Sequence, residues 1–259
     1  MKNKEVIKHI VSWLTDYSAE SHTNGFVIGI SGGIDSALTS TLCALTQKPV
    51  IVLNMPIRQH QGEFDRSAEH IEWLEKNYTN VTSEHMDLTS IFEKIENDFP
   101  VSIQNFLTMA NTRARLRMLT LYAFAGHYKM LVAGTGNKIE DFGVGFFTKY
   151  GDGGVDISPI ADLLKSEVYA LAKELHVPES ILQAKPTDGL FHDGRSDEDQ
   201  IGATYDELEW AMLALEKNKE EKQFSEREKQ VMKIYKERNS ANRHKMETIP
   251  VCMIPKELL

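Results

Sequence analysis

The sequence predicts a doubly wound α/β fold, in which a mainly parallel sheet carries helices on both faces. Three observations predict it. Short apolar runs alternate with helical patterns along the chain. Two of these runs lead directly into loops of small residues, as buried parallel strands do where they end at a ligand site. The length of 259 residues suits one large domain, which we expect to span residues 1–259.

The first half of the chain contains the clearest strands. After an amphipathic first helix, the apolar runs at 26–30 and 49–54 predict two strands joined by a helix at 37–45. This unit has about the minimum size for a right-handed parallel crossover. The patterns that follow predict helices at 62–77 and 105–128 and extended segments at 79–86 and 129–133.

The second half is less regular. Residues 143–159 are rich in glycine and lack periodicity, and the stretch is long enough to be a functional loop. Helices are expected at 165–175 and 206–215, and a polar, mobile loop at 189–202. The run 216–237 mixes both signs of charge, which is typical of a solvated helical face.

Composition excludes several classes of function. The formal net charge of −9 argues against general attraction to nucleic acid, so an anionic ligand would need a few placed cations. Cys43 and Cys252 lie far apart and outside any Cys/His set, which predicts neither a disulfide framework nor a zinc site. The chain shows no signal peptide and no apolar run of about 18 residues. We therefore expect a cytoplasmic protein without a membrane or nucleic-acid partner.

A phosphate loop is the strongest local signal. The segment Ser-Gly-Gly-Ile-Asp-Ser follows the first strand, where Gly32 and Gly33 let backbone N–H groups face an anion at a helix N-terminus. Ser31 and Ser36 add hydroxyl donors, and Asp35 is a carboxylate suited to Mg²⁺. The loop has neither the lysine and spacing of a Walker A motif nor the G-x-G-x-x-G pattern. Kinase-type transfer and dinucleotide hydride chemistry therefore lose support.

The same segment resembles the pyrophosphate loop of the ATP pyrophosphatases. Its five fixed residues arise by chance on the order of once in a million positions. In that family the loop grips the β- and γ-phosphates of ATP while a substrate oxygen attacks the α-phosphorus. The resemblance therefore implies ATP as a co-substrate. The residues that it assigns to ATP here are Gly29, Ile30, Ser31, Gly32, Gly33, Ile34, Asp35 and Ser36.

Motifs in the second half narrow the resemblance to NAD synthetases, over about residues 25–250. They occur in the order found in that family: Asn111-Thr-Arg-Ala-Arg-Leu-Arg-Met118, Gly134-Thr135, Glu140, Gly145 to Asp156, Ser158-Pro159, Lys165, Lys185-Pro-Thr187, Asp197-Glu198 and His244-Lys245. No upstream amidase domain is seen, which favours the ammonia-dependent form. The resemblance implies a five-stranded sheet of the adenine nucleotide alpha hydrolase type and a symmetric homodimer.

The implied reaction is adenylation of the nicotinate carboxylate of deamido-NAD with release of pyrophosphate, followed by attack of ammonia to give NAD and AMP. The resemblance assigns Mg²⁺ to Asp35 and Glu140. It adds Thr135, Thr187 and Lys165 to the ATP contacts, and it gives deamido-NAD to Arg115, Lys149, Asp156, His244 and Lys245. The expected catalytic residues are Asp35, Asp156 and Lys165.

Several alternatives stay open. Arg113, Arg115 and Arg117 cannot share one helix face at a spacing of two, so at most one or two point to the site. Deamido-NMN is an alternative substrate for the same chemistry. Another amide synthetase among the ATP pyrophosphatases and a non-catalytic nucleotide sensor are rival functions, but a sensor gives no reason for Glu140 and Lys149.

Overall fold

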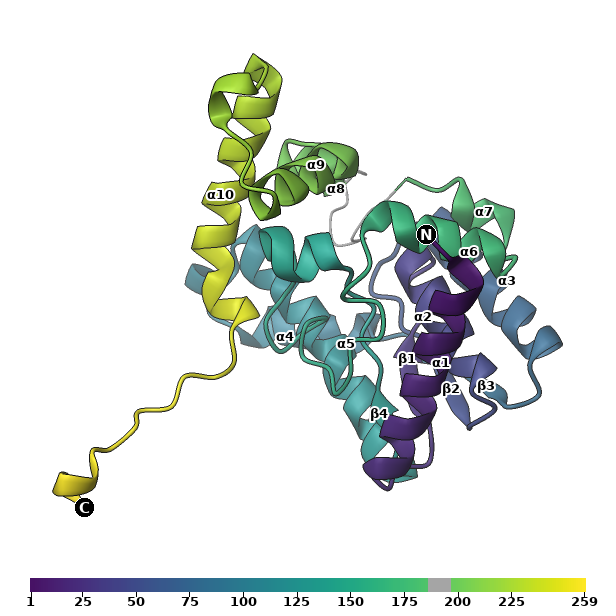
Figure 1. Cartoon of the computed structure of the whole chain (residues 1–259). Coiled ribbons are helices and arrows are strands. Elements are labelled where there is room, and N and C mark those ends of the chain that lie inside the picture. The colour runs from purple at the N-terminus through teal and green to yellow at the C-terminus, as the bar shows by residue number, and fades with distance from the viewer. Residues whose placement is uncertain (186–196) are drawn as a thin grey trace.

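A parallel sheet of four strands organises the computed structural model, which describes residues 1–185 and 197–259. The strands lie in the order β3-β2-β1-β4 (Figure 1). They are β1 (Phe26–Gly29), β2 (Val50–Asn54), β3 (Val81–His85) and β4 (Leu131–Val132). All three neighbouring pairs are parallel. The predicted α/β fold with a parallel sheet is therefore confirmed.

The expected fifth strand is absent from the described residues, so that part of the prediction is wrong. Beside β4 the chain makes only one isolated parallel bridge, between Ala133 and Ile157. The N–H of Val132, which faces this side, donates to the Asp156 Oδ2 at 2.8 Å. Because a side chain takes a hydrogen bond that a strand backbone would make, the ladder is not extended.

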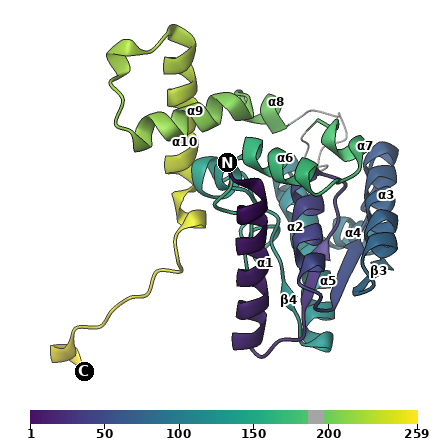
Figure 2. The same ribbon diagram turned by 45° about the vertical axis from the view of Figure 1, so that its right-hand side comes forward.

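Helices cover both faces of the sheet (Figure 2). Alternate strand residues point to opposite faces, and both sets are apolar, as in a buried parallel sheet. Phe26 and Ile28 share a core with the helices of one face, while Val27 and Leu53 share a core with those of the other. The first face carries α1 (Asn3–Glu20), α2 (Ile34–Leu45), α3 (Gln61–Asn77), α6 (Lys165–Glu174) and α7 (Glu179–Leu182); the second carries α4 (Thr89–Asp98) and α5 (Phe106–Tyr128).

A third apolar core lies outside the sheet. It joins the π-helix η2 (Ile139–Val144) to α8 (Asp197–Ile201), α9 (Tyr205–Glu216) and α10 (Glu226–Met246). The loop expected at 189–202 is wrong for residues 197–201, which form α8, and its residues 189–196 lie outside the described part. Three short 3-10 turns complete the fold: η1 (Val101–Ile103), η3 (Glu221–Gln223) and η4 (Lys256–Leu258). Of the helices described, none has the length and apolar character needed to cross a membrane.

The C-terminal tail, residues 247–259, leaves the end of α10 and extends away from the body of the molecule (Figures 1 and 2). Its apolar side chains are exposed, with Ile249 at 67%, Val251 at 75% and Met253 at 81%. The tail therefore leaves a row of apolar side chains open to solvent.

One buried histidine gives the fold a pH dependence. His70 on α3 is fully buried, and its Nε2 lies 2.9 Å from the Ser40 hydroxyl of α2. Burial lowers the pKa of His70 from 6.5 to about 4. Since the unfolded chain binds the proton more readily, the stability present above pH 6.5 falls as the pH drops towards 4, by up to about 3 kcal/mol.

We expect His70→Gln to remove this loss between pH 6.5 and 4, measured by urea unfolding at several pH values. His9→Gln, at an exposed position on α1, is the control and should keep the wild-type slope. A His70→Gln protein with the wild-type slope would contradict the assignment.

Candidate active site

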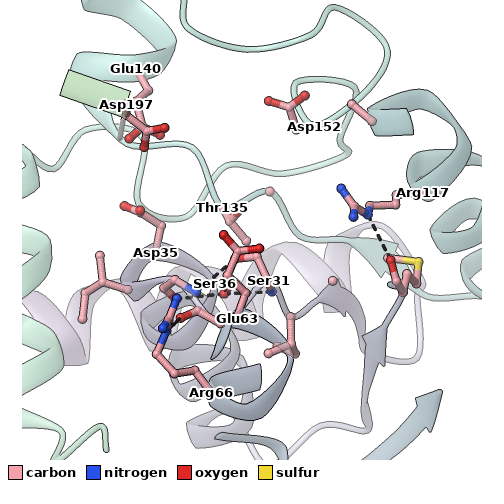
Figure 3. A pocket seen from close by; sticks show the side chains of 18 of the residues that line it. Ser31, Asp35, Ser36, Glu63, Arg66, Arg117, Thr135, Glu140, Asp152 and Asp197 are labelled. Carbon is pink, nitrogen blue, oxygen red and sulfur yellow. Dashed lines mark hydrogen bonds between the residues drawn. The ribbon is translucent and has the colours of Figure 1, made fainter. Parts of the chain in front are cut away.

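A pocket lies at the carboxyl ends of β1 and β4 (Figure 3). From β1 the sheet continues to β2 and β3 on one side and to β4 on the other. The loops that follow β1 and β4 therefore diverge, and ligands of open α/β sheets bind at this kind of position. The pocket is lined by both loops and by parts of α3, α5, α6 and α8.

The loop after β1 forms a cradle for an anion. Gly32 adopts a φ of 84°, and a Cβ at this position would lie 2.6 Å from the carbonyl oxygen of Glu63 on α3, so only glycine fits. The hydroxyl of Ser36 donates to the Gly33 carbonyl oxygen at 3.0 Å and accepts from the Ser31 N–H at 3.3 Å. Helix α2 begins at Ile34, directly after Gly33. The first N–H groups of the helix have no partner within it, and they face the pocket as donors for a phosphate.

Two carboxylates meet beside this cradle, where a lysine bridges them. Asp35 comes from the first turn of α2 and Glu140 from η2. The Lys165 Nζ lies 2.6 Å from the Asp35 Oδ2 and 3.0 Å from the Glu140 Oε1. Burial alone lowers the pKa of Lys165, but the attraction of Asp35 and Glu140 outweighs it and raises the pKa above its ordinary value. Lys165 therefore stays charged at neutral pH.

This carboxylate pair fits a divalent cation that arrives with phosphates. Both carboxylates already contact the same positive charge, the Lys165 ammonium. Their oxygens are also the type of ligand that Mg²⁺ prefers. Among the described residues, no group of three or more His, Cys, Asp or Glu side chains could hold a metal by itself. A metal here would need phosphate oxygens and water to complete its coordination.

Negative charge is concentrated at this end of the pocket. Figure 3 shows Asp35, Glu140 and Asp197 gathered at one end, with Arg117 and Asp152 at the other. Burial raises the pKa of Asp141 to about 8, and the charge of Glu140 adds to the effect. Such a site favours cations among its carboxylates and disfavours bare phosphate unless cations accompany it.

All the described residues that the sequence assigns to ATP line this pocket. They are Gly29, Ile30, Ser31, Gly32, Gly33, Ile34, Asp35, Ser36, Thr135 and Lys165. Thr187 lies outside the described residues. The loop and the residues after β4 are thus brought together as expected from strands that end at one edge of a sheet.

The residues assigned to deamido-NAD lie elsewhere. Arg115 and Lys149 meet beside the end of α10, where the Arg115 Nε donates to the Lys149 carbonyl oxygen at 3.2 Å and the Lys149 Nζ donates to that of His244 at 2.7 Å. The Lys245 Nζ donates to the Phe147 carbonyl oxygen at 2.7 Å. None of Arg115, Lys149, His244 and Lys245 lines the pocket, although Phe146 of the same loop does.

Asp156 uses both carboxylate oxygens within the fold. Its Oδ1 accepts from the Tyr122 hydroxyl at 2.9 Å and its Oδ2 from the Val132 N–H. It borders a separate surface groove together with Trp13 and Phe142. These contacts tie the glycine-rich loop to β4 and α5.

The three arginines of α5 separate as their spacing requires. Arg117 lines the pocket, with its Nε donating to the Met55 carbonyl oxygen at 3.0 Å, whereas Arg115 is exposed outside it. Arg113 is buried over the Phe92 ring. Arg66 of α3 was not among the predicted site residues, yet its Nε donates to the Gly32 carbonyl oxygen at 3.3 Å. Arg66 lies far from the loop in the sequence, and it could be recognised only once the packing of α3 against the loop was known.

Comparisons with known proteins find relatives over most of the chain. The NAD synthase family profile matches residues 6–249. The NH(3)-dependent NAD(+) synthetase of Alkaliphilus metalliredigens is 40% identical over 227 residues, which cover 85% of this chain and 91% of the relative. The structure of NMN synthetase from Francisella tularensis has a TM-score of 0.85 and 33% identity, and the match covers 99% of each chain. The NH3-dependent NAD synthetase from Campylobacter jejuni has a TM-score of 0.80 and 26% identity, covering 98% of this chain and 100% of that one.

The bridging lysine provides a test of the charge balance. Lys165→Met leaves two neighbouring, partly buried carboxylates without their shared cation, so we expect a loss of stability of about 3 kcal/mol. Mg²⁺ alone should then raise the melting temperature of Lys165→Met more than that of the wild type.

Thermal melts with and without Mg²⁺ measure this effect. The control is Lys138→Met, which removes a lysine paired at the surface with Asp162 at 3.3 Å and should cost less than about 1 kcal/mol. Equal melting temperatures for the two variants would show that the bridge does not balance the site.

Proposed function

The chain belongs to the NAD synthase family, and from this premise we propose that it converts deamido-NAD to NAD with ammonia and ATP. The enzyme is a ligase that forms a C–N bond. An oxygen of the nicotinate carboxylate attacks the α-phosphorus of ATP, and the bond to the β-phosphate breaks. Ammonia then attacks the acyl carbon, loses a proton and expels AMP.

The observation that carries the proposal is the pairing of the phosphate cradle with the carboxylates Asp35 and Glu140 at one edge of the sheet. The cradle suits the β- and γ-phosphates, because its N–H groups and hydroxyls all donate. Asp35 and Glu140 would hold Mg²⁺, which supplies charge neutralisation to the leaving pyrophosphate when it is bound.

The protein's own cations complete the site. Lys165 and Arg66 lie beside the cradle, where we assign them to the phosphates of ATP. Arg117, at the other end of the pocket, is placed to pair with the nicotinate carboxylate and to bring it to the α-phosphorus (Figure 3). The nicotinate carboxylate and the α-phosphate repel each other, and cations fixed beside both lower this part of the barrier. The catalytic role of Asp156 stays a prediction.

Deamido-NMN is a second candidate substrate. The Francisella tularensis protein, whose structure aligns with 99% of this chain at 33% identity, is an NMN synthetase. Arg115, Lys149, His244 and Lys245 would contact the adenylate half of deamido-NAD, yet three of their polar groups already bond to backbone carbonyls. A mononucleotide would not need them.

The proposed assembly is a homodimer. The apolar side chains of the tail are exposed, and Leu107 and Leu119 of α5 are 63% and 67% exposed. Association of two copies would cover such surfaces. In this assembly the tail of one copy contacts the other.

The reaction is tested by incubating the protein with ATP, Mg²⁺ and ammonium and either deamido-NAD or deamido-NMN. We expect AMP and pyrophosphate in equal amounts with the amide, and a higher kcat/KM for deamido-NAD. Asp35→Asn should lower kcat/KM by about 100-fold or more, because it weakens the metal site. Asp98→Asn, on the exposed end of α4, is the control. Absence of AMP with both substrates would refute the proposed reaction.

The assembly is tested by light scattering after size-exclusion chromatography. The wild type should have twice the 29.4 kDa mass of one chain. Ile249→Asp combined with Val251→Asp should shift it towards the monomer, because burying two charges in an apolar contact is unfavourable. Lys256→Ala in the same tail should leave the mass unchanged. A monomeric wild type would contradict the proposal.

A further inference from the structure

We propose that Asn137 and Tyr205 are positioning residues that hold Asp35 and Glu140 in one arrangement before the nucleotide binds. Neither residue lies within the phosphate cradle. The inference rests on the proposed function, because that proposal assigns the metal to Asp35 and Glu140.

Asn137 connects the two carboxylate-bearing segments through one amide group. It is fully buried. Its Oδ1 accepts from the N–H groups of Ile139 and Glu140 at 3.1 and 3.2 Å, and its Nδ2 donates to the Asp35 Oδ1 at 3.1 Å. The two ends of an amide have opposite hydrogen-bonding roles, so these partners determine its orientation.

The position of Asn137 follows from the start of η2. The first N–H groups of a helical segment have no partner within it, and the Asn137 Oδ1 satisfies two of them. The N–H of Asp141 donates to the Asn137 carbonyl oxygen at 2.9 Å. Asn137 therefore anchors the turn that carries Glu140, and its Nδ2 fixes the distance of that turn from Asp35.

Tyr205 holds the Glu140 side chain from another element. It is the first residue of α9 and is 5% exposed. Its hydroxyl donates to the Glu140 Oε1 at 2.5 Å, and the Asp197 Oδ2 lies 3.3 Å away. A capping box between Thr204 and Glu207 fixes the start of α9 and so the backbone of Tyr205.

The hydrogen bonds are distributed over the carboxylate oxygens as follows from the positions of their donors. Asp35 presents its Oδ1 to Asn137 and its Oδ2 to Lys165. Glu140 accepts from both Tyr205 and Lys165 on Oε1, and within the described residues its Oε2 makes no hydrogen bond. If Lys165 turned to the phosphates, Asn137 and Tyr205 would remain as contacts that keep the carboxylates facing one another.

This arrangement lowers the cost of binding a metal with ATP. Two carboxylates that must converge on one ion repel each other and lose side-chain freedom, and neutral donors that pre-position them remove part of both costs. The advantage applies to the metal complex of ATP and not to ATP alone. That difference separates positioning from general stabilisation of the fold.

The test compares the affinity of each variant for Mn²⁺–ATP and for ATP in the presence of a chelator, without the carboxylate substrate, by isothermal titration calorimetry. Tyr205→Phe should weaken Mn²⁺–ATP binding about ten-fold, as expected for one hydrogen bond to a charged group. Its affinity for metal-free ATP should change less than about two-fold. Asn137→Ala should show the same selective loss.

Tyr235→Phe is the matched control. Tyr235 lies in the same apolar core as Tyr205 and is also 5% exposed, but it makes no hydrogen bond to Asp35 or Glu140. It should leave both affinities unchanged. Tyr205→Phe with wild-type affinity for Mn²⁺–ATP, or with an equal loss for both ligands, would overturn the inference. The binding assay needs no turnover, so its failure refutes only the positioning roles. Failure of the wild type to form AMP would refute the proposed reaction.

Discussion

One buried ammonium holds together the part of the molecule on which the chemistry depends. Asp35 and Glu140 are brought side by side by two different segments, and their repulsion is offset by the Nζ of Lys165. The phosphate cradle, the segment after β4 and the start of α6 meet at this point. Each segment contributes one charged group, so the site exists only when all three are in place.

The strand order explains why these segments meet. β1 lies between β2 and β4, and its following loop therefore borders the loop of a strand that comes about 100 residues later in the chain. The apolar residues on both sides of β1 keep it central, with α2 packed on one face and α5 on the other. The helical core of α8, α9 and α10 then closes the acidic end through Tyr205.

The sequence predicted what local patterns encode. The strands and the glycine cradle follow from short-range order, since apolar runs and glycine pairs act over a few residues. The assignment of Gly29 to Ser36 to ATP came from the family resemblance, and these residues do line the pocket. The position of Arg117 in the pocket and of Arg115 outside it, like the contacts of Asn137 and Tyr205, depends on how distant segments pack. The absence of the fifth strand could not be predicted either, because the Asp156 side chain, and not a strand backbone, accepts the hydrogen bond from Val132. Hydrophobic periodicity carries no information about such a contact.

The lysine bridge has a consequence for the protein in the cell. Because the site carries its own counter-charge, the folded state does not depend on a metal to hold its carboxylates together. If Asp35 and Glu140 hold Mg²⁺ as proposed, a shortage of magnesium would slow turnover without reducing the amount of folded protein. Turnover could then resume as soon as the ion returned, with no need to make the enzyme again.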